Sequence, residues 1–263
     1  NRSVFTFVGS KDAVIAGSLN AVNVAVQRID LRTHKGTHPR MGAVDVVPFV
    51  PIKNATMDDC VSIANEVGKQ IAERFGVPVY LYEFAARIPS RKNLANIRSG
   101  EFEGIRETIA TDDTRIPDFG PRKVHESAGC TAVGARMPLI AYNVYLKTSD
   151  VKIAKKIAKQ IREKDGGLPG IKALGFFIES RNLAQISMNI CDYKKTSIYE
   201  VFNRIAVLAR SLGTEVLSSE LVGLIPADAL SPGNPRDLLL ENFDPRKQVI
   251  EEVLKSLPGF QET

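Results

Sequence analysis

Residues 31–52 read LRTHKGTHPRMGAVDVVPFVPI and join two kinds of sequence. The first half holds two of the chain's three histidines, His34 and His38, among basic residues. Three helix-breaking residues predict that this half is a loop: Gly36, Pro39 and Gly42. The second half, residues 43–52, is apolar and β-branched, which predicts a buried strand with its prolines at an edge-like end. The stretch therefore puts a histidine-bearing loop directly before a buried strand.

His38 is a candidate for general acid–base catalysis, because imidazole gains and loses a proton near neutral pH. Pro39 favours an extended backbone at His38, which would hold the ring in one place. The sequence leaves open the alternative that His38 is an ordinary surface residue. The i, i+4 spacing of His34 and His38 is that of a helical metal pair, but the loop excludes the helix, so we expect no bound metal.

The composition is that of a globular protein and gives no sign of a membrane protein or a disulfide-rich one. The chain has 263 residues, 44% of them apolar, which is enough for one large domain or two ordinary ones. No apolar run reaches the roughly 20 residues of a membrane helix. The three cysteines match no zinc or disulfide pattern and no signal peptide opens the chain, so we expect a cytoplasmic protein. The net charge of +5 is spread along the chain, which favours small anionic ligands over nucleic acid.

The first half of the chain alternates strands with helices. Its apolar spacing predicts, in order, strand 1–9, helix 11–30, strand 43–52, helix 57–75 and strand 77–82. Thr56 is the expected N-cap of the second helix, and Gly76 the residue that ends it. Residues 113–129 then form a long, basic, glycine-punctuated loop whose backbone amides could approach an anion. An ordinary connecting loop is the alternative.

The second half predicts a complete α/β unit. Its strands and helices are expected, in order, at 139–146, 149–164, 171–179, 184–193, 198–212 and 215–225. This order is βαββαβ, the split βαβ plan of ferredoxin-like domains, and the first half has a similar order. We therefore predict an α/β (α+β) fold of two tandem ferredoxin-like subdomains, residues 1–134 and 135–263, with a cleft between them. An amphipathic helix is expected at 245–257.

Seven sequence blocks resemble one protein family. They are HKGTHPRMGAVDVVPFVP at 34–51, VPVYLYEFAA at 77–86, IPSRKNLANIRSGEFEG at 88–104, PDFGP at 117–121, GCTAVGARMPLIAYN at 129–143, ESRNLAQISMN at 179–189 and SELVGLIP at 219–226. In this order and over nearly the whole chain, they resemble the formiminotransferase domain family. The family has a further strand region before residue 1, which leaves open what that part contributes to the site.

The resemblance implies transfer of the formimino group from N-formiminoglutamate to tetrahydrofolate, the co-substrate, in histidine degradation and one-carbon metabolism. It implies that His38 is catalytic and that the chain forms a homodimer without membrane or nucleic-acid partners. It assigns folate binding to one segment: Gly120, Pro121, Arg122, Lys123, Val124, His125, Glu126, Ser127, Ala128 and Gly129. The interior of this segment departs from the animal sequences. Arg40, Arg91 and Arg136 are candidates for contacts with the anionic substrates, since arginine binds carboxylates in a bidentate manner. Asp45 is a further candidate of the substrate site, which could orient or charge His38.

Other functions remain open at this point. The donor could be N-formylglutamate, whose acyl group differs from formimino by one atom. A non-catalytic folate- or anion-binding protein on the same fold is a second alternative, because fold alone does not fix function. A hydrolase or cyclase acting on a related one-carbon folate is a third. We do not expect cyclodeaminase activity, since no such domain follows Thr263 in the sequence.

Overall fold

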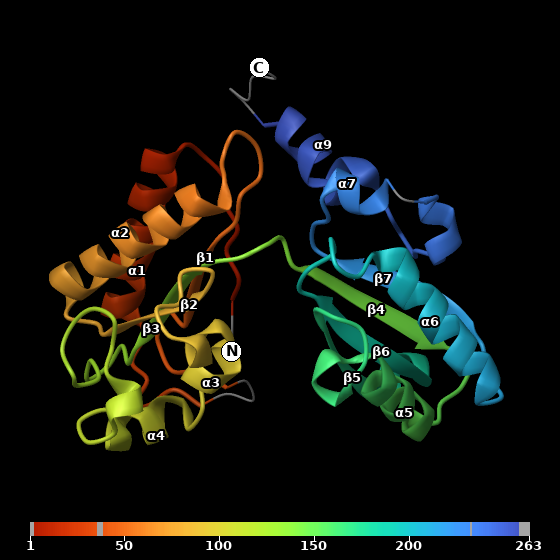
Figure 1. Cartoon of the computed structure of the whole chain (residues 1–263), viewed down its shortest axis with the longest axis horizontal. Coiled ribbons are helices and arrows are strands. Elements are labelled where there is room, and N and C mark those ends of the chain that lie inside the picture. Colours follow the sequence, from red (N-terminus) through yellow and green to blue (C-terminus); the bar gives the residue numbers. More distant parts are fainter. Residues whose placement is uncertain (1–2, 36–38, 232, 258–263) are drawn as a thin grey trace. The chain divides into compact units, whose positions relative to one another are not determined.

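Two separate sheets organise the chain in the computed structural model, which describes residues 3–35, 39–231 and 233–257. The chain divides into two units, Asn1–Arg136 (unit 1) and Met137–Thr263 (unit 2), each with its own sheet (Figure 1). The predicted α/β class with two subdomains is confirmed. The predicted boundary between residues 134 and 135 falls at the end of the last strand of unit 1 and stays a prediction, as does the cleft between the subdomains.

Unit 1 is built on a three-stranded parallel sheet in the order β1–β3–β2. Its strands are β1 (Val46–Phe49), β2 (Val79–Glu83) and β3 (Thr131–Ala135), and β3 pairs with both of the others. The ferredoxin-like plan predicted for this half is therefore not the arrangement of its described strands. Helix α2 (Met57–Phe75) joins β1 to β2, and a crossover of this kind returns the chain in the same direction, which makes the strands parallel.

Helices α1 (Lys11–Arg28) and α2 cover one face of this sheet, where they share a core with apolar residues of all three strands. Helix α2 starts at a capping box, in which Thr56 Oγ1 accepts from Asp59 N (3.1 Å) and Asp59 Oδ2 accepts from Thr56 N (2.8 Å). It ends at Gly76, whose φ of 65° is left-handed. Both ends lie where the sequence predicts them.

The opposite face of the same sheet carries the chain between β2 and β3. This part contains 3-10 helices η1 (Pro89–Lys92) and η2 (Asp113–Arg115) and helices α3 (Leu94–Ile97) and α4 (Glu101–Thr108). Phe102 and Ile105 of α4 pack with Tyr80, Tyr82 and Ala132, which alternate along the strands with the residues that face α2. The parallel sheet is thus buried on both faces, as parallel sheets usually are.

Unit 2 has the ferredoxin-like plan that the sequence predicts. Its elements are β4 (Ile140–Leu146), α5 (Val151–Ile161), η3 (Glu163–Asp165), β5 (Ile171–Ile178), η4 (Glu179–Arg181), β6 (Leu183–Ile190), α6 (Ile198–Ser211) and β7 (Val216–Val222). The four strands pair antiparallel in the order β5–β6–β4–β7. Helices α5 and α6 share one core with the inward-facing residues of the sheet, including Tyr142 and Ile186.

The C-terminal part corrects the prediction of one helix over 245–257. After α7 (Ala227–Leu230) and η5 (Pro235–Leu238), the structure has two short helices, α8 (Pro245–Gln248) and α9 (Ile250–Lys255). Val249 between them is extended, with φ −88° and ψ 122°. Ile225 N donates to Gln248 O (2.8 Å) and Ile250 N donates to Ile225 O (3.0 Å), so pairing with the chain after β7 interrupts the helix.

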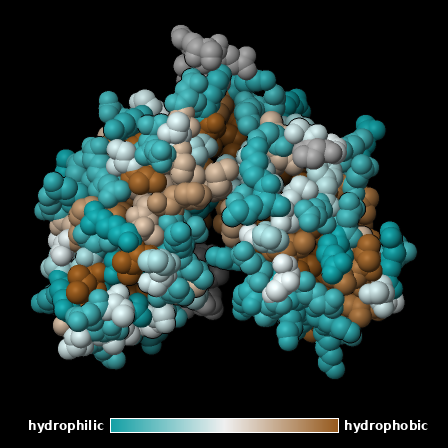
Figure 2. Space-filling view, viewed as in Figure 1, coloured by the Kyte–Doolittle hydropathy of each residue, from teal (hydrophilic) through white to brown (hydrophobic). Residues whose placement is uncertain are grey.

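The strand predicted at residues 1–9 is also corrected for the described part, residues 3–9, which forms no strand. Val4 and Phe5 of this alternating segment are more than four-fifths exposed. Alternation makes a strand only where another strand offers its edge, and none of the described strands pairs with this segment. Elsewhere the apolar side chains are mostly internal, and on the face drawn in Figure 2 hydrophilic residues cover most of both units.

Candidate functional site

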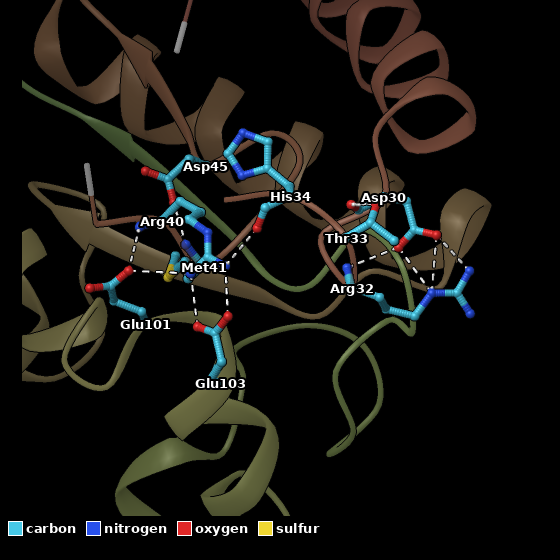
Figure 3. Close-up of polar contacts among 9 residues, drawn as sticks. All are labelled: Asp30, Arg32, Thr33, His34, Arg40, Met41, Asp45, Glu101 and Glu103. Atoms are coloured by element: carbon cyan, nitrogen blue, oxygen red, sulfur yellow. Dashed lines mark hydrogen bonds and ion pairs between the residues drawn. The ribbon is translucent and has the colours of Figure 1, made fainter. Parts of the chain in front are cut away.

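The loop before β1 is fixed at its first end by Asp30. The Asp30 carboxylate accepts from the Arg32 backbone N (2.9 Å) and from Arg32 Nη2 (2.6 Å), and the Asp30 carbonyl accepts from His34 N (3.1 Å) (Figure 3). The ring nitrogen Nδ1 of His34 is buried and has no hydrogen-bond partner among the described residues. His38, predicted to be catalytic, lies outside the described residues, so its role stays a prediction. Both flanks of the loop are described.

The predicted folate segment is joined to both flanks of this loop. Three backbone hydrogen bonds make the connection: Leu31 N to Ser127 O (2.8 Å), Ala43 N to Ala128 O (2.9 Å) and Cys130 N to Met41 O (2.9 Å). The last two belong to an antiparallel bridge between Gly42 and Gly129. Residues about 90 apart in the chain are therefore held together by main-chain contacts.

Glycine is required on both sides of that bridge. A Cβ atom at Gly42 would lie 1.9 Å from the Cys130 carbonyl oxygen, and one at Gly129 would lie 2.1 Å from the Met41 carbonyl oxygen. Gly129 also has a φ of +69°, which is left-handed. Burial raises the pKa of the neighbouring Cys130 thiol to about 12, which makes this cysteine a poor nucleophile at neutral pH. Cys130 is part of the buried core of unit 1, next to the bridge.

A cavity of about 350 Å³ opens beside the folate segment. Its lining consists of Arg32, Gly76, Pro121, Lys123, Val124, His125, Glu126 and Ser127. His125 Nδ1 accepts from Ala128 N (3.1 Å), so the proton of a neutral His125 ring resides on Nε2, where it can be donated. Arg32 is paired with Asp30 and, at 3.1 Å, with Glu126. Cations, an imidazole and acceptors thus surround a space large enough for part of a small ligand.

The residues of the predicted folate segment that do not line the cavity contact other parts of unit 1. Arg122 Nε donates to Ile109 O (2.9 Å) and Arg122 Nη2 pairs with Asp113 (2.7 Å). Ala128 is buried in the core of unit 1, and Gly120, with φ +90°, turns the chain against α2. The segment therefore contains structural residues as well as cavity-lining ones.

Arg40 lies on the far flank of the loop and is held by acidic residues of α4. Its Nη1 and Nη2 atoms pair with Glu103 at 2.8 and 2.6 Å, and Nη1 also contacts Glu101 at 3.2 Å (Figure 3). Nη2 donates in addition to the His34 carbonyl oxygen (3.4 Å). The hydrogen bonds from Arg40 lower the pKa of Glu103 to about 2. Arg40 thus connects the two flanks of the loop to α4.

Asp45, at the start of the strand segment, is held in a similar way. Asp45 Oδ1 accepts from Met41 N (2.8 Å), and Oδ2 forms a short ion pair with Arg98, which follows α3. Arg98 was not among the residues selected from the sequence, although it lies in the block IPSRKNLANIRSGEFEG. Its partner lies 53 positions away, and no local pattern could have indicated that pair.

Arg91 and Arg136 have other partners than Arg40. The side chain of Arg91 is 9% exposed and pairs with buried Asp118 at 2.7 Å, with further hydrogen bonds to the carbonyl oxygens of Thr114 and Ile116. These contacts favour a structural role for Arg91, and its substrate role stays a prediction. The backbone of Arg136 donates to Phe49 O (3.0 Å) at the end of β3.

The structure also bears on metal binding and membranes. In residues 3–35, 39–231 and 233–257, no three or more His, Cys, Asp or Glu side chains are grouped to hold a metal ion. Since His38 lies outside these ranges, the expected absence of a metal stays a prediction. No helix of the described chain has the length and apolar character needed to cross a membrane.

Comparison with known proteins connects these features to a family. Residues 1–136 match the formiminotransferase domain, N-terminal subdomain, and residues 141–234 match the formiminotransferase domain. A glutamate formimidoyltransferase of Streptococcus pyogenes is 47% identical over 97% of this chain and 85% of its own length. A glutamate formimidoyltransferase of Thermoplasma acidophilum is 44% identical over 93% of this chain and 80% of its own length. A formimidoyltransferase-cyclodeaminase of Dictyostelium discoideum is 42% identical over 97% of this chain, which spans 48% of that protein.

Proposed function

The chain belongs to the formiminotransferase domain family, and we propose that it is a glutamate formimidoyltransferase. In this reaction the formimino group of N-formiminoglutamate moves to N5 of tetrahydrofolate and glutamate is released. The observation that carries the proposal is the set of three backbone hydrogen bonds between segment 125–130 and the two flanks of the His38 loop. A folate bound along residues 120–129 would lie beside the loop that supplies the proposed proton carrier.

The chemistry needs one group that can both accept and donate a proton. N5 of tetrahydrofolate attacks the amidine carbon and forms a tetrahedral intermediate, and the attacking nitrogen then loses a proton. The bond from that carbon to the glutamate nitrogen breaks, and this nitrogen must gain a proton because an amide anion is a poor leaving group. A histidine near neutral pH can do both steps, and we assign this role to His38. Such proton transfer accelerates a reaction by about 10²–10⁴-fold.

The folate segment, Gly120–Gly129, is proposed to contact tetrahydrofolate mainly through its cavity-lining part. Lys123 and His125 lie there with Arg32, and these groups suit the carboxylates of a folate tail. Arg136 is proposed as a further substrate contact, and Asp45 is proposed to orient or charge His38. Arg40 and Arg91 give most of their guanidinium hydrogens to protein acceptors, so a direct substrate contact is the weaker proposal for these two.

Further parts of the proposal rest on the sequence and on the family. We propose a cytoplasmic homodimer that uses no metal, in the degradation of histidine. The subdomains are proposed to be residues 1–134 and 135–263, with the ligand cleft between them.

A donor assay tests the proposal. Purified protein is incubated with tetrahydrofolate and either N-formiminoglutamate or N-formylglutamate, and the folate product and free glutamate are measured. We expect turnover with N-formiminoglutamate at least about tenfold faster in kcat/KM, equivalent to about 1.4 kcal/mol in transition-state binding. Faster turnover of N-formylglutamate would reassign the donor. Folate binding without turnover of either compound would support a binding protein instead.

A further inference from the structure

We propose that Arg40 and Glu103 are positioning residues, which hold the His38 loop on helix α4 rather than contacting a substrate. This inference rests on the proposed function, because it assigns these residues an effect on a histidine-dependent reaction. It also differs from the interpretation drawn from the family, which makes Arg40 a candidate for binding a substrate carboxylate.

The donors of Arg40 are used within the protein. Its side chain is only 14% exposed, and both terminal nitrogens face Glu103, at 2.8 and 2.6 Å. One of them also contacts Glu101, and the other the carbonyl oxygen of His34. Nε is buried and has no acceptor within the described chain. A bidentate pair of this kind has a fixed geometry, so a substrate carboxylate would have to displace Glu103 to occupy the same fork.

Arg40 reaches both flanks of the loop. Its own backbone is on the flank after residues 36–38, and its guanidinium contacts the carbonyl oxygen of His34 on the flank before them. One side chain thus holds the two flanks of the segment that contains His38 (Figure 3). Arg40 therefore ties the described flank that ends at residue 35 to the described flank that begins at residue 39.

The α4 side of the contact is fixed as well. Phe102, which follows Glu101, is 2% exposed in the core and donates its backbone N–H to Arg40 O (2.9 Å). Glu101 has a φ of +55°, a conformation that residues other than glycine seldom adopt. A backbone conformation of this kind persists only where surrounding contacts hold it. At Glu101 one such contact is the hydrogen bond that the Arg40 backbone N–H donates to the Glu101 carboxylate (3.4 Å).

A second ion pair joins the same regions with the charges reversed. Arg40 of the loop pairs with acidic residues of α4, whereas Asp45 after the loop pairs with the basic Arg98 after α3. A loop displaced along α3 and α4 would lose both pairs. The two pairs therefore fix the register of residues 40–45 against residues 98–103.

A double-mutant cycle tests the positioning role. Arg40→Met, Glu103→Gln and the double variant are compared with wild type for kcat and for the KM of N-formiminoglutamate and tetrahydrofolate. We expect each single variant to lower kcat by about 10- to 100-fold with both KM values within about twofold, because small misplacement of a catalytic group costs rate. The double variant should be no slower than the slower single one, since the two residues act as a unit.

Glu107→Gln is the matched control, because Glu107 is an exposed acid on the same helix. It should leave kcat unchanged, and near-equal thermal midpoints of all variants would exclude unfolding as the cause. A rise in the KM of N-formiminoglutamate in Arg40→Met, with Glu103→Gln like wild type, would overturn the positioning role in favour of substrate binding. Equal kcat losses in Glu103→Gln and Glu107→Gln would also overturn it. Absence of turnover in the wild type would instead contradict the proposed function.

Discussion

The sheets of the two units are buried by different sets of elements. In unit 1 the parallel sheet has α1 and α2 on one face and the α3–α4 segment on the other. In unit 2 the antiparallel sheet shares its core with α5 and α6, and β5 keeps Leu174 and Phe176 about half exposed. A sheet covered on both faces needs long connections, and in unit 1 these connections carry the His38 loop, its ion pairs and the folate segment.

This difference indicates where rigid contacts are concentrated. The connections of unit 1 are held by a buried ion pair, a bridge that requires two glycines and the two pairs described above. The Arg181–Glu241 pair of unit 2 is more exposed than the Arg91–Asp118 pair of unit 1, with side chains that are 34% and 33% exposed against 9% and 5%. Matched substitutions in the two units should therefore have unequal effects.

The largest difference is expected between two ion pairs. Arg91→Ala in unit 1 should lower the free energy of unfolding by about 3–5 kcal/mol, because buried Asp118 keeps only the Leu81 backbone N–H and the more distant Arg87, 3.9 Å away, as partners. Arg181→Ala in unit 2 should cost about 1 kcal/mol or less, since its pair is partly solvated. Urea unfolding monitored by circular dichroism gives both values. A mild Arg91→Ala with a raised KM for N-formiminoglutamate would instead favour substrate binding by Arg91.

Two glycines with positive φ give the next comparison. Gly129→Ala should cost about 2–5 kcal/mol, from a left-handed alanine and from the collision with the Met41 carbonyl oxygen. Gly213→Ala in unit 2, at φ +75° with no atom within 4 Å of the added Cβ, should cost only the backbone part, about 1–2 kcal/mol. Equal losses in a denaturant titration would show that the bridge tolerates a side chain.

Helix caps should give smaller and similar effects in both units. Thr56→Ala removes a capping box from α2, and Ser197→Ala removes a single hydrogen bond to Glu200 N (3.1 Å) from α6. Each should cost about 1 kcal/mol, because one backbone N–H of the first turn loses its acceptor. Thr56→Ala should be the larger, since Asp59 also loses the hydrogen bond that the Thr56 hydroxyl donates (2.6 Å). Thermal unfolding measures the difference, and kcat should not change. A loss of activity in either variant would mean that the cap also supports the site.

The smallest effect concerns pH. The hydrogen bonds from Arg40 lower the pKa of Glu103 from 4.5 to about 2, so the ionised acid stabilises the folded state above its unfolded pKa. This contribution should disappear as the pH falls through about 4.5 towards about 2. The stability difference between wild type and Glu103→Gln should therefore be constant near neutral pH and shrink below about pH 5. Because the Glu103 side chain is 54% exposed, solvent screening keeps this difference small. A difference that grows in acid would contradict the assignment.

Local patterns predicted the fold well where the relevant contacts are local. The ends of α2 follow from Thr56 and Gly76, and the order of strands and helices in unit 2 gave its ferredoxin-like plan. Patterns failed where a distant partner decides the structure. Residues 3–9 alternate but pair with no described strand, and the helix expected at 245–257 is interrupted by pairing with Ile225.

The same distinction between local patterns and distant partners applies to the candidate site. The loop was predicted from Gly36, Pro39 and Gly42, and its described flanks, residues 31–35 and 39–42, are non-helical. The residues that hold the loop could not, because Arg40 meets Glu103 across 63 positions and Asp45 meets Arg98 across 53. The sequence shows where an arginine can bind a carboxylate, but it does not show whether that carboxylate belongs to a substrate or to the protein.

The proposed reaction depends most directly on His38 as its proton carrier. Turnover of tetrahydrofolate with N-formiminoglutamate is measured for wild type, His38→Ala and His34→Ala, beside a binding isotherm for folate. We predict that His38→Ala loses about 10²–10⁴-fold in kcat with folate affinity unchanged, and that His34→Ala is far milder. Wild-type turnover in His38→Ala would contradict the catalytic assignment.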